Sequence, residues 1–325
     1  MPTSPRPFRF ALQAFSTGSS KEWADTARQA EDLGYTTLFT TDHYFGPGEI
    51  ASSSGHRPVD VAPIAAMMAA AGVTNHLRVG CRVFCVDYHQ PVVLAKELAT
   101  VDFLTDGRVE AAFGAGWVAA EYEGLGIPMD TAGVRIARLA EWIELVRAQW
   151  SGDPVEVDGE HVHASGFVGA PMPVQDSIPI MIGGGSPKVL RLAGRLADVV
   201  SFNFNNAAGT LGPNSFGTST EEQTLQKLDW VREGAGQRFD DLELEIGAYF
   251  TAVSDHPREA AEALGNRFGV SADDVLGHPH ALVGTVADIC DTLRQRRESL
   301  GISYITVAQR HLEEFAPVVA ELAGQ

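Results

Sequence analysis

The sequence has little cysteine and no long apolar run, and each absence excludes a class of protein. Three cysteines, Cys81, Cys85 and Cys290, are too few for a disulfide framework in 325 residues. Cys81 and Cys85 lie in an apolar stretch, so we expect small core residues and a reducing, cytoplasmic setting. No hydrophobic run approaches the ~20 residues that a membrane-spanning helix needs, and the first residues lack the apolar core of a secretory signal.

Basic side chains are also scarce. The chain has 24 Lys and Arg against 42 Asp and Glu, which gives a formal net charge of −18. A surface of that charge repels nucleic acid and anionic lipid, so we expect neither as a partner. An anionic ligand would have to be held by local features, because the overall field opposes it.

Several motifs of common enzyme classes are missing. No G-x-G-x-x-G follows the first predicted strand, which argues against a Rossmann domain. No G-x-S-x-G elbow is present, which argues against an α/β-hydrolase. The pairs His161/His163 and His278/His280 lack the carboxylate or cysteine spacing of a metal site. We therefore predict no metal and expect these histidines to be solvated.

The sequence does contain an alternation of strand-like and helix-like segments. Apolar and β-branched runs predict strands at residues 8–15, 36–41, 77–86, 108–113, 178–182, 198–202, 242–253 and 302–307. Helices are predicted between them, one with Ser19 and Glu22 as a capping box and the last capped by Thr285. About eight strand-then-helix units favour one α/β domain over residues 1–325, a (β/α)8 TIM barrel with insertions.

Two segments interrupt this alternation. Residues 155–162 predict a small hairpin around Asp158-Gly159, the residue pair that a type I′ turn prefers. Residues 205–220 are rich in Gly, Asn, Ser and Thr, and we expect a mobile loop that lies as a lid over the strand ends.

Function in such a barrel lies at the carboxyl ends of the strands, and two of these ends carry unusual polar residues. His43 follows the second strand, and an imidazole can move a proton near neutral pH. The alternative is a structural histidine capped by Asp42. Arg82 is charged within the apolar third strand, and position alone favours an arginine that faces the outer helices and pairs with a carboxylate there.

Two further strand ends are rich in glycine. Gly114-Ala115-Gly116 would let a flat ring approach the backbone, and Trp117 either walls that pocket or belongs to the core. Gly183-Gly184-Gly185 precede Ser186 and Pro187, which suit the cap and first position of a helix. Free N–H groups there can hold a phosphate, with Lys188 and Arg191 adding charge. The alternative is a tight turn that needs positive φ.

Taken together, these residues resemble the bacterial luciferase-like oxidoreductases over nearly the whole chain. The resemblance is carried by Ala27-Arg28, Ala30-Glu31, Leu33-Gly34, Asp42-His43, His89-Gln90-Pro91, Leu94-Ala95-Lys96-Glu97, Asp102, Asp106-Gly107-Arg108-Val109, Gly114-Ala115-Gly116-Trp117, Glu121-Tyr122, Pro171-Met172-Pro173-Val174-Gln175, Pro179-Ile180-Met181-Ile182-Gly183-Gly184 and Gly284-Thr285. The combination is much more specific than any single piece.

The resemblance implies a barrel, usually a homodimer, that binds coenzyme F420 or FMN and acts on a small-molecule substrate. In F420-using relatives a non-proline cis peptide in the third strand backs the deazaflavin ring. Matching the sequence places it at Arg82–Val83, with Cys85 where relatives contact the ring. Gly183-Gly184-Gly185-Ser186 match the loop that holds the cofactor phosphate, and His43 matches the active-site histidine.

One departure narrows the expected function. The sugar-phosphate dehydrogenase branch carries an acid where this chain has Trp117, which points to the broader F420-dependent branch. We therefore expect an oxidoreductase that transfers hydride between coenzyme F420 and an unidentified small organic substrate. The alternatives are an FMN-dependent luciferase-like monooxygenase and a non-catalytic flavin- or deazaflavin-binding protein.

Overall fold

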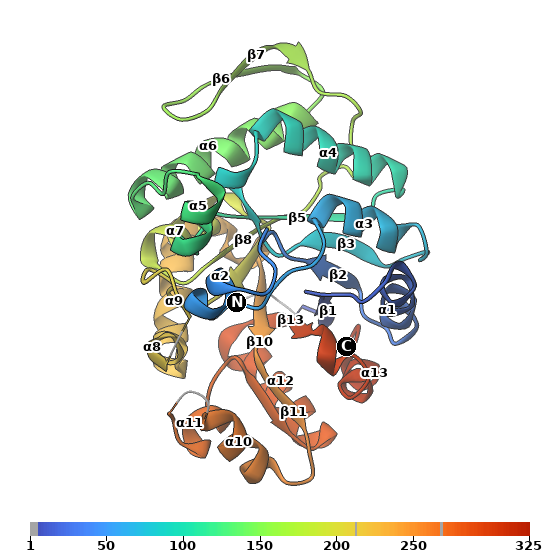
Figure 1. Cartoon of the computed structure of the whole chain (residues 1–325), viewed down its shortest axis with the longest axis vertical. Helices are drawn as coiled ribbons and strands as arrows, with labels where there is room; N and C mark the ends of the chain where they lie inside the picture. Colours follow the sequence, from blue (N-terminus) through green and yellow to red (C-terminus); the bar gives the residue numbers. More distant parts are fainter. Residues whose placement is uncertain (1–5, 212, 267–268) are drawn as a thin grey trace.

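Nine strands of the described chain form a central sheet whose pairings are all parallel. They are β1 (Arg9–Gln13), β2 (Thr37–Thr40), β3 (Arg78–Cys81), β4 (Phe84–Cys85), β5 (Val109–Gly114), β8 (Ile180–Gly184), β9 (Val199–Phe202), β10 (Glu243–Ala248) and β13 (Ile302–Ala308). The computed structural model describes residues 6–211, 213–266 and 269–325, and the strand order is β3-β2-β1-β13-β10-β9-β8-β5-β4. β3 also pairs with β5, which closes the barrel (Figure 1). Since β3 and β4 share one position, the barrel has eight positions, and the predicted (β/α)8 fold is confirmed.

Helices surround this barrel (Figure 1). The longer ones are α1 (Ser20–Asp32), α3 (Pro63–Ala71), α4 (Pro91–Leu104), α6 (Ala132–Trp150), α7 (Pro187–Leu196), α9 (Glu221–Ala235), α10 (Pro257–Gly265), α12 (Val286–Leu300) and α13 (Ala316–Leu322). The shorter ones are α2 (Glu49–Ser54), α5 (Ala119–Leu125), α8 (Pro213–Phe216) and α11 (Ala272–Leu276), with 3-10 turns η1 (Val86–Tyr88), η2 (Gly217–Ser219), η3 (Gly236–Asp241) and η4 (Gln309–His311). In α7, the buried residues Val189, Leu190 and Ala193 follow the spacing of one helix face, and the main core lies between strands and helices. Among the described helices, none combines the length and apolarity that crossing a membrane requires.

Two helix starts show how local sequence sets these bounds. At α12, Thr285 is the N-cap, as the sequence predicts, and it forms a complete capping box with Asp288. At α1, the Ser19 hydroxyl accepts the Glu22 N–H at 3.1 Å, but the Glu22 carboxylate accepts the N–H of Gly18. The capping box predicted there is therefore only half formed, because the carboxylate reaches one residue further back.

Two long predicted strands are each broken in two. Residues 77–86 form β3 and β4, which are separated by Arg82 and Val83, and the peptide bond between these two residues is cis. Residues 242–253 form β10 and then β11 (Phe250–Val253), which leaves the barrel and pairs with β12 (Ala281–Gly284). The hydrophobic pattern hides both breaks, because an apolar run looks the same whether or not it stays in one sheet.

The two predicted insertions differ in detail from the sequence expectation. β6 (Pro154–Asp158) and β7 (His163–Val168) form the hairpin, but Asp158 pairs with His163, so the predicted type I′ turn is wrong. Residues 159–162 form the loop instead, and the Glu141 carboxylate accepts three of its N–H groups at 2.7–3.1 Å. Residues 205–220 contain α8 and η2 rather than one continuous loop, and residue 212 lies outside the described residues.

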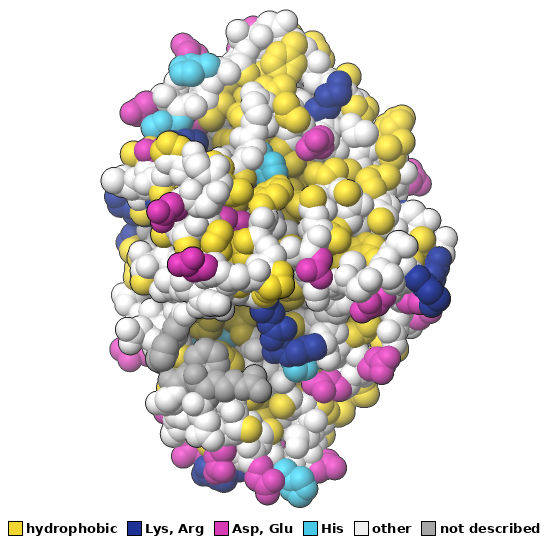
Figure 2. Space-filling model, viewed as in Figure 1, with side chains coloured by type: hydrophobic (Ala, Val, Ile, Leu, Met, Phe, Trp, Pro, Cys, Tyr) yellow, Lys and Arg dark blue, Asp and Glu magenta, His cyan; other side chains and the backbone are white. Residues whose placement is uncertain are grey.

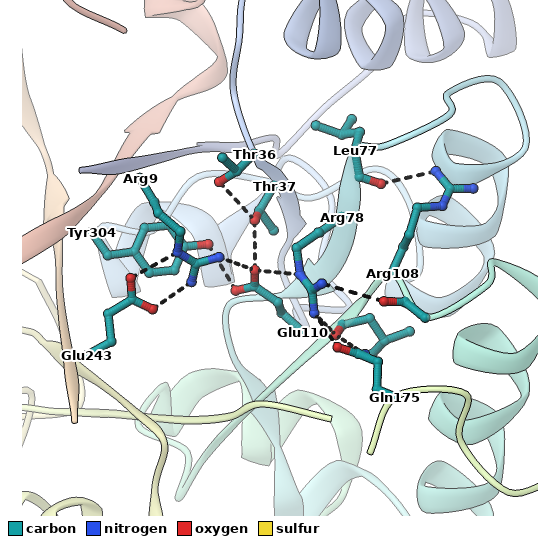
Figure 3. Close-up of polar contacts among 12 residues, drawn as sticks. Arg9, Thr36, Thr37, Leu77, Arg78, Arg108, Glu110, Gln175, Glu243 and Tyr304 are labelled. Atoms are coloured by element: carbon teal, nitrogen blue, oxygen red, sulfur yellow. Dashed lines mark hydrogen bonds and ion pairs between the residues drawn. The ribbon is translucent and has the colours of Figure 1, made fainter. Parts of the chain in front are cut away.

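A buried charge network closes the amino ends of the strands (Figure 3). Glu110 is 2% exposed, and its Oε1 accepts hydrogen bonds from Arg9, Arg78 and Thr37 at 2.9–3.0 Å. Its Oε2 accepts from the Tyr304 hydroxyl at 3.0 Å. Burial alone would raise the pKa of Glu110, but the guanidinium groups of Arg9 and Arg78 outweigh burial and lower it. This end of the barrel is therefore filled, and space for a ligand lies at the other end.

Side chains inside the barrel form layers at every second residue of each strand. The central layer consists of Ala11, Phe39, Ala112, Met181, Val199 and Tyr304. Two residues further along the same strands lie Gln13, Thr41, Gly114, Gly183, Ser201 and Thr306. This second set is the upper layer, and it faces the carboxyl ends of the strands.

Candidate active site

A cavity of about 540 Å³ lies at the carboxyl ends of the strands, and most of the upper layer forms its floor. Its volume is in the range of sites that bind cofactors and small ligands. All of the site residues predicted from the sequence line it: His43, Arg82, Val83, Cys85, Gly114, Ala115, Gly116, Trp117, Gly183, Gly184, Gly185 and Ser186. The fold therefore brings together four strand ends that are far apart in the chain, while the role of each residue stays a prediction.

One half of the cavity floor is level. Val83 follows the cis peptide bond, which lies where the family resemblance places it. A Cβ atom on Gly114 would lie 2.6 Å from Cγ2 of Val83, and one on Gly183 would lie 3.3 Å from Cγ1 of Val83. A larger residue at Gly114 would displace Val83, so the two glycines keep this half of the floor flat, as a planar ring requires.

Arg82 points into the barrel. Its guanidinium pairs with the buried Glu245 of β10, with Nε–Oε1 and Nη2–Oε2 distances of 3.1 Å. Nη2 also donates to Ser201 Oγ at 3.1 Å, and the Arg82 carbonyl accepts from Gln13 Nε2 at 3.0 Å. The interpretation that Arg82 faces the outer helices is wrong, because Glu245 inside the barrel offsets the cost of burying its charge.

Cys85 is a buried thiol on the cavity wall. Its N–H donates to Asp42 Oδ2 at 2.8 Å, and the same oxygen lies 2.8 Å from Nε2 of His89. The sulfur lies 3.4 Å from the Tyr122 hydroxyl. Burial raises the pKa of Cys85 to about 12, so the side chain is a neutral thiol, suited to packing rather than nucleophilic attack.

Glu121, rather than the neighbouring Asp42, holds His43. Nδ1 of His43 donates to Glu121 Oε2 at 2.6 Å, and Glu121 is 1% exposed. The other carboxylate oxygen accepts the Tyr44 N–H at 2.7 Å, and the Tyr88 hydroxyl donates to Oε2 at 3.1 Å. Because the carboxylate fixes a proton on Nδ1, Nε2 is the nitrogen of His43 that can exchange a proton with a ligand.

His56 stands beside His43 and was not singled out in the sequence. The two ring centroids are 4.1 Å apart, and the Trp117 ring meets both edge-on at 6.2 and 5.9 Å, so Trp117 belongs to the cavity wall. Nδ1 of His56 donates to the Arg57 carbonyl oxygen at 2.8 Å. Burial, followed by the nearby His43, lowers the pKa of His56 to about 3, so this ring is neutral.

The glycine run joins β8 to α7. A Cβ atom on Gly185 would lie 2.3 Å from the Phe204 carbonyl oxygen, which leaves no room for a side chain. None of Gly183, Gly184 and Gly185 has a positive φ, so the alternative of a turn that needs positive φ is wrong. Ser186 occupies the N-cap position of α7, yet its hydroxyl makes no capping hydrogen bond. That hydroxyl and the N–H groups of the first helical turn are suited to a phosphate.

Arginines outnumber acidic residues on the cavity wall. Arg57, Arg82, Arg135 and Arg310 line it, and Asp42 is the acidic side chain among the described lining residues. Arg135 of α6 also donates to the Ala115 carbonyl oxygen at 2.9 Å, which fixes the end of β5. Glu245 neutralises Arg82, so the formal positive excess on the wall comes from the other three arginines, in a chain whose net charge is −18.

The pair His278/His280 is buried, and the prediction that it is solvated is wrong. The two residues are 1% and 0% exposed, and His280 stacks on Tyr249 with centroids 5.0 Å apart. Nδ1 of His280 donates to the Gly247 carbonyl oxygen at 2.7 Å. Burial lowers the pKa of both histidines, so they serve as neutral packing groups in an aromatic cluster. No local pattern indicates this burial, because the aromatic neighbours come from other segments.

Similar proteins indicate the family to which this chain belongs. Residues 7–272 match the family described as luciferase-like monooxygenase. An uncharacterised protein of Mycobacterium tuberculosis is 30% identical over 200 residues, which cover 58% of this chain and 70% of that protein. An F420-dependent glucose-6-phosphate dehydrogenase of Nakamurella multipartita is 30% identical over 246 residues, which cover 74% of this chain and 66% of that protein.

The fold extends to more distant proteins. The coenzyme F420-dependent tetrahydromethanopterin reductase of Methanopyrus kandleri has a TM-score of 0.72 and 17% identity, covering 98% of this chain and 100% of that chain. At that identity the likeness supports the barrel alone. The family match spans most of the sequence, and this chain belongs to the luciferase-like monooxygenase family.

Proposed function

We propose that this protein is an F420-dependent oxidoreductase that transfers hydride between the deazaflavin and a small organic substrate. One observation carries the proposal: the four predicted strand ends line a single cavity, whose level floor at Val83, Gly114 and Gly183 continues into the glycine run before α7. The dehydrogenase relative of Nakamurella multipartita supports F420 as the cofactor.

The residues present fit such a cofactor at both of its ends. Val83, Gly114 and Gly183 leave a flat surface on which a ring can rest, with the Cys85 thiol beside it. Beyond Gly183, the Ser186 hydroxyl and the first N–H groups of α7 would hold the phosphate.

The protein's part in the reaction is to position the reactants and exclude water. When bound, F420 supplies the carbon that accepts or donates the hydride. His43 takes a proton from a substrate oxygen or nitrogen at Nε2, or returns one, while Glu121 keeps Nδ1 protonated and stabilises the resulting imidazolium. The rings of His56 and Trp117 close the wall beside His43 and keep water from the reacting atoms.

Titration of the purified apoprotein with F420 and with FMN tests the proposal. We expect saturable F420 binding at about 10–100 μM or below. Gly114→Val should abolish binding, because its side chain would enter the level floor. Gly46→Ala is the matched control, since no atom lies within 4 Å of the added carbon. Absence of F420 binding to the wild-type protein in this range would refute the proposal.

An FMN-dependent monooxygenase is the second candidate, and the family match favours it directly. The same floor and phosphate loop would serve FMN. A yellow protein with bound flavin, or flavin-dependent oxygen consumption, would decide for this alternative. Tight cofactor binding without hydride transfer to any tested substrate would favour a non-catalytic binding protein, and intact His43 argues against that outcome.

We also propose that the protein is a homodimer. Helix α4 exposes three large apolar side chains, Val93, Phe103 and Leu104, at 54%, 56% and 62% of their surface. Figure 2 shows hydrophobic side chains on the upper right of the molecule, where α4 runs in Figure 1. Large exposed apolar side chains can belong to a protein interface, and a second copy is the occupant that the family resemblance implies.

A further inference from the structure

We propose that His56 is a second substrate-binding residue, whose Nε2 accepts a hydrogen bond from a hydroxyl group on the carbon next to the reacting carbon. The substrate class that fits is a vicinal diol, together with the α-hydroxy ketone that its oxidation gives. The inference rests on the proposed function, because it names the substrate class of the same cavity. It adds a residue that selects the substrate.

His43 and His56 offer two neighbouring ring nitrogens that solvent can reach. Both residues line the cavity, and their ring centroids are 4.1 Å apart. Nε2 of each ring has no hydrogen-bond partner among the described residues. Neither Nε2 belongs to the buried unpartnered atoms of that part of the chain, so both are accessible. One small ligand in the cavity can therefore contact both nitrogens.

Both of these nitrogens are acceptors when the rings are neutral. Nδ1 of His43 lies 2.6 Å from a carboxylate oxygen of Glu121. Nδ1 of His56 lies 2.8 Å from the Arg57 carbonyl oxygen. Because these oxygens accept hydrogen bonds, each Nδ1 carries the ring proton and Nε2 is bare. Burial lowers the pKa of His56 to about 3, so its Nε2 accepts at neutral pH and does not donate.

The turn that carries His56 is held by its neighbours. Helix α2 ends at Ser54, whose Oγ accepts the N–H of His56 at 3.2 Å. Gly55 follows with a φ of 72°, and a Cβ atom there would lie 2.6 Å from the Leu211 carbonyl oxygen. This turn therefore needs glycine, and it fixes the backbone from which the imidazole packs on His43.

Aromatic rings surround the two imidazoles. Phe15, Phe45 and Trp117 each lie with ring centroids 5.9 Å from that of His56. Nε2 of His56 is thus a polar atom set among apolar faces. A ligand with a hydroxyl group at this point pairs the nitrogen, whereas an analogue without it leaves the nitrogen unpaired. A site of this kind discriminates strongly between two such ligands.

The reaction on a vicinal diol changes one of its two carbons. The C–H bond of the reacting carbon breaks, and the hydride leaves with both electrons for the deazaflavin that the proposed function supplies. The proton of the hydroxyl on that carbon goes to Nε2 of His43, and C–OH becomes C=O. The neighbouring hydroxyl stays intact on His56, which neither gains nor loses a proton. The reverse reaction reduces the α-hydroxy ketone with the same contacts.

Propylene glycol and isopropanol test the inference, because they differ by one neighbouring hydroxyl group. NMR spectra of the full chain that correlate ring nitrogens with ring protons should show a bare Nε2 on His56. Propylene glycol should shift the Nε2 signals of both His43 and His56, and should bind about tenfold more tightly than isopropanol. A protonated Nε2 on His56, no binding of the glycol, or equal affinity for the two alcohols would overturn the inference.

Substitution of His56 separates the acceptor from the packing of its ring. His56→Phe keeps a ring in the wall, so we expect about tenfold weaker binding of propylene glycol and unchanged binding of isopropanol, measured on the His43 signal. His56→Gln supplies an amide oxygen and should recover most of the affinity. His163→Phe, at an exposed histidine outside the cavity, is the control and should equal the wild type.

Equal weakening of both alcohols in His56→Phe would show a damaged wall and would overturn the role of His56. Titration with F420 keeps the two proposals apart. If F420 binds and the preference for the glycol is absent, this inference alone falls. If the preference is present and F420 does not bind, the proposed function alone falls.

Discussion

The carboxylate of Glu121 accepts the Nδ1 proton of His43 at 2.6 Å, across 78 positions of sequence. Glu121 is 1% exposed, and Tyr44 and Tyr88 bind the same carboxylate. A carboxylate held this firmly can fix one tautomer of the imidazole and stabilise its cation. The relationship supports the proposed role of His43 as the group that exchanges a proton with the substrate.

The substitution Glu121→Gln should slow turnover without affecting cofactor binding. It keeps the shape of the side chain but removes the charge that stabilises a protonated His43, so we expect kcat to fall about 10²-fold. The dissociation constant of F420 should stay within about twofold, since Glu121 does not line the cavity. Steady-state deazaflavin absorbance and binding titration would measure the two quantities.

His43→Ala should lose turnover to a similar extent. Glu123→Gln, an exposed change on the same helix α5, is the control and should behave as the wild type. Full turnover in His43→Ala, or equal rates in the two glutamine variants, would contradict the assigned role.

Two serines at helix N-caps should respond in opposite ways to removal of their hydroxyl. Ser19 caps α1 by accepting the Glu22 N–H at 3.1 Å, so Ser19→Ala should cost about 1 kcal/mol of unfolding free energy and leave binding unchanged. Ser186 makes no capping bond, so Ser186→Ala should leave stability unchanged and weaken the binding of F420 and FMN.

Denaturant unfolding and fluorescence titration of both variants check this pair. The phosphate-binding role of Ser186 is wrong if Ser186→Ala binds both cofactors as the wild type does. It is equally wrong if the variant loses stability as Ser19→Ala does, because the hydroxyl would then act as an ordinary cap.

The sequence could predict the barrel and most of the candidate site for one physical reason. Parallel strands end at the same rim, so unusual residues after four predicted strands converge whatever the details of the helices. The glycines at 183–185 were recognisable because strand, glycine and helix cap stand in a fixed order in the chain, and Gly114 because small residues end a predicted strand. These are local patterns, and the fold only has to bring them to one end.

The partners of the predicted residues could not be found in this way. Arg82 turns inward because Glu245, 163 positions away, meets it inside the barrel, and no local pattern says which side of a buried strand a charge occupies. Glu121 lies in the short helix α5, and His56 packs on His43 from a loop. Such pairs arise from tertiary packing, which periodicity does not encode.

The proposed homodimer predicts that one charge on α4 will separate the subunits. Leu104→Glu places a carboxylate among the exposed apolar side chains of α4, so light scattering after gel filtration should change from dimer to monomer mass. Leu225→Glu, at a similarly exposed leucine of α9, should remain dimeric. A wild-type protein of monomer mass would refute the assembly.

The lowered pKa of Glu110 predicts that part of the unfolding free energy is lost at acid pH. Its pKa is lowered in the folded chain, so its contribution is present above the unfolded value of about 4.3 and is lost as pH falls through the lower folded value. Glu110→Gln leaves Arg9 and Arg78 without their shared anion and should cost about 3–5 kcal/mol at neutral pH.

Denaturant unfolding of Glu110→Gln across the acid range should also show a shallower loss of stability than the wild type. Glu298→Gln, an exposed change, should follow the wild-type curve. If Glu110→Gln also follows the wild-type curve, the charge of Glu110 does not stabilise the fold through the network in Figure 3.

The lowered pKa of Lys227 predicts a pH dependence of the same sign on the alkaline side. It is 1% exposed, and its Nζ donates to the Asn203 carbonyl oxygen at 2.7 Å and to Ser219 Oγ, with no carboxylate paired to it in the described part of the chain. Burial lowers the pKa of Lys227 to about 7, while an unfolded lysine titrates near 10.4. Between these values the unfolded chain binds more protons, so stability should rise with pH by up to about 1.4 kcal/mol per unit.

Lys227→Met should remove this slope, and denaturant unfolding at several pH values between about 7 and 10 would measure it. The exposed Lys21→Met is the control and should keep the slope. The slope is the informative quantity, because the variant also deprives Asn203 and Ser219 of a donor and loses stability at every pH. An unchanged slope in Lys227→Met would mean that the buried amine keeps its charge when folded, and that Asn203 and Ser219 hold an ammonium rather than a neutral amine.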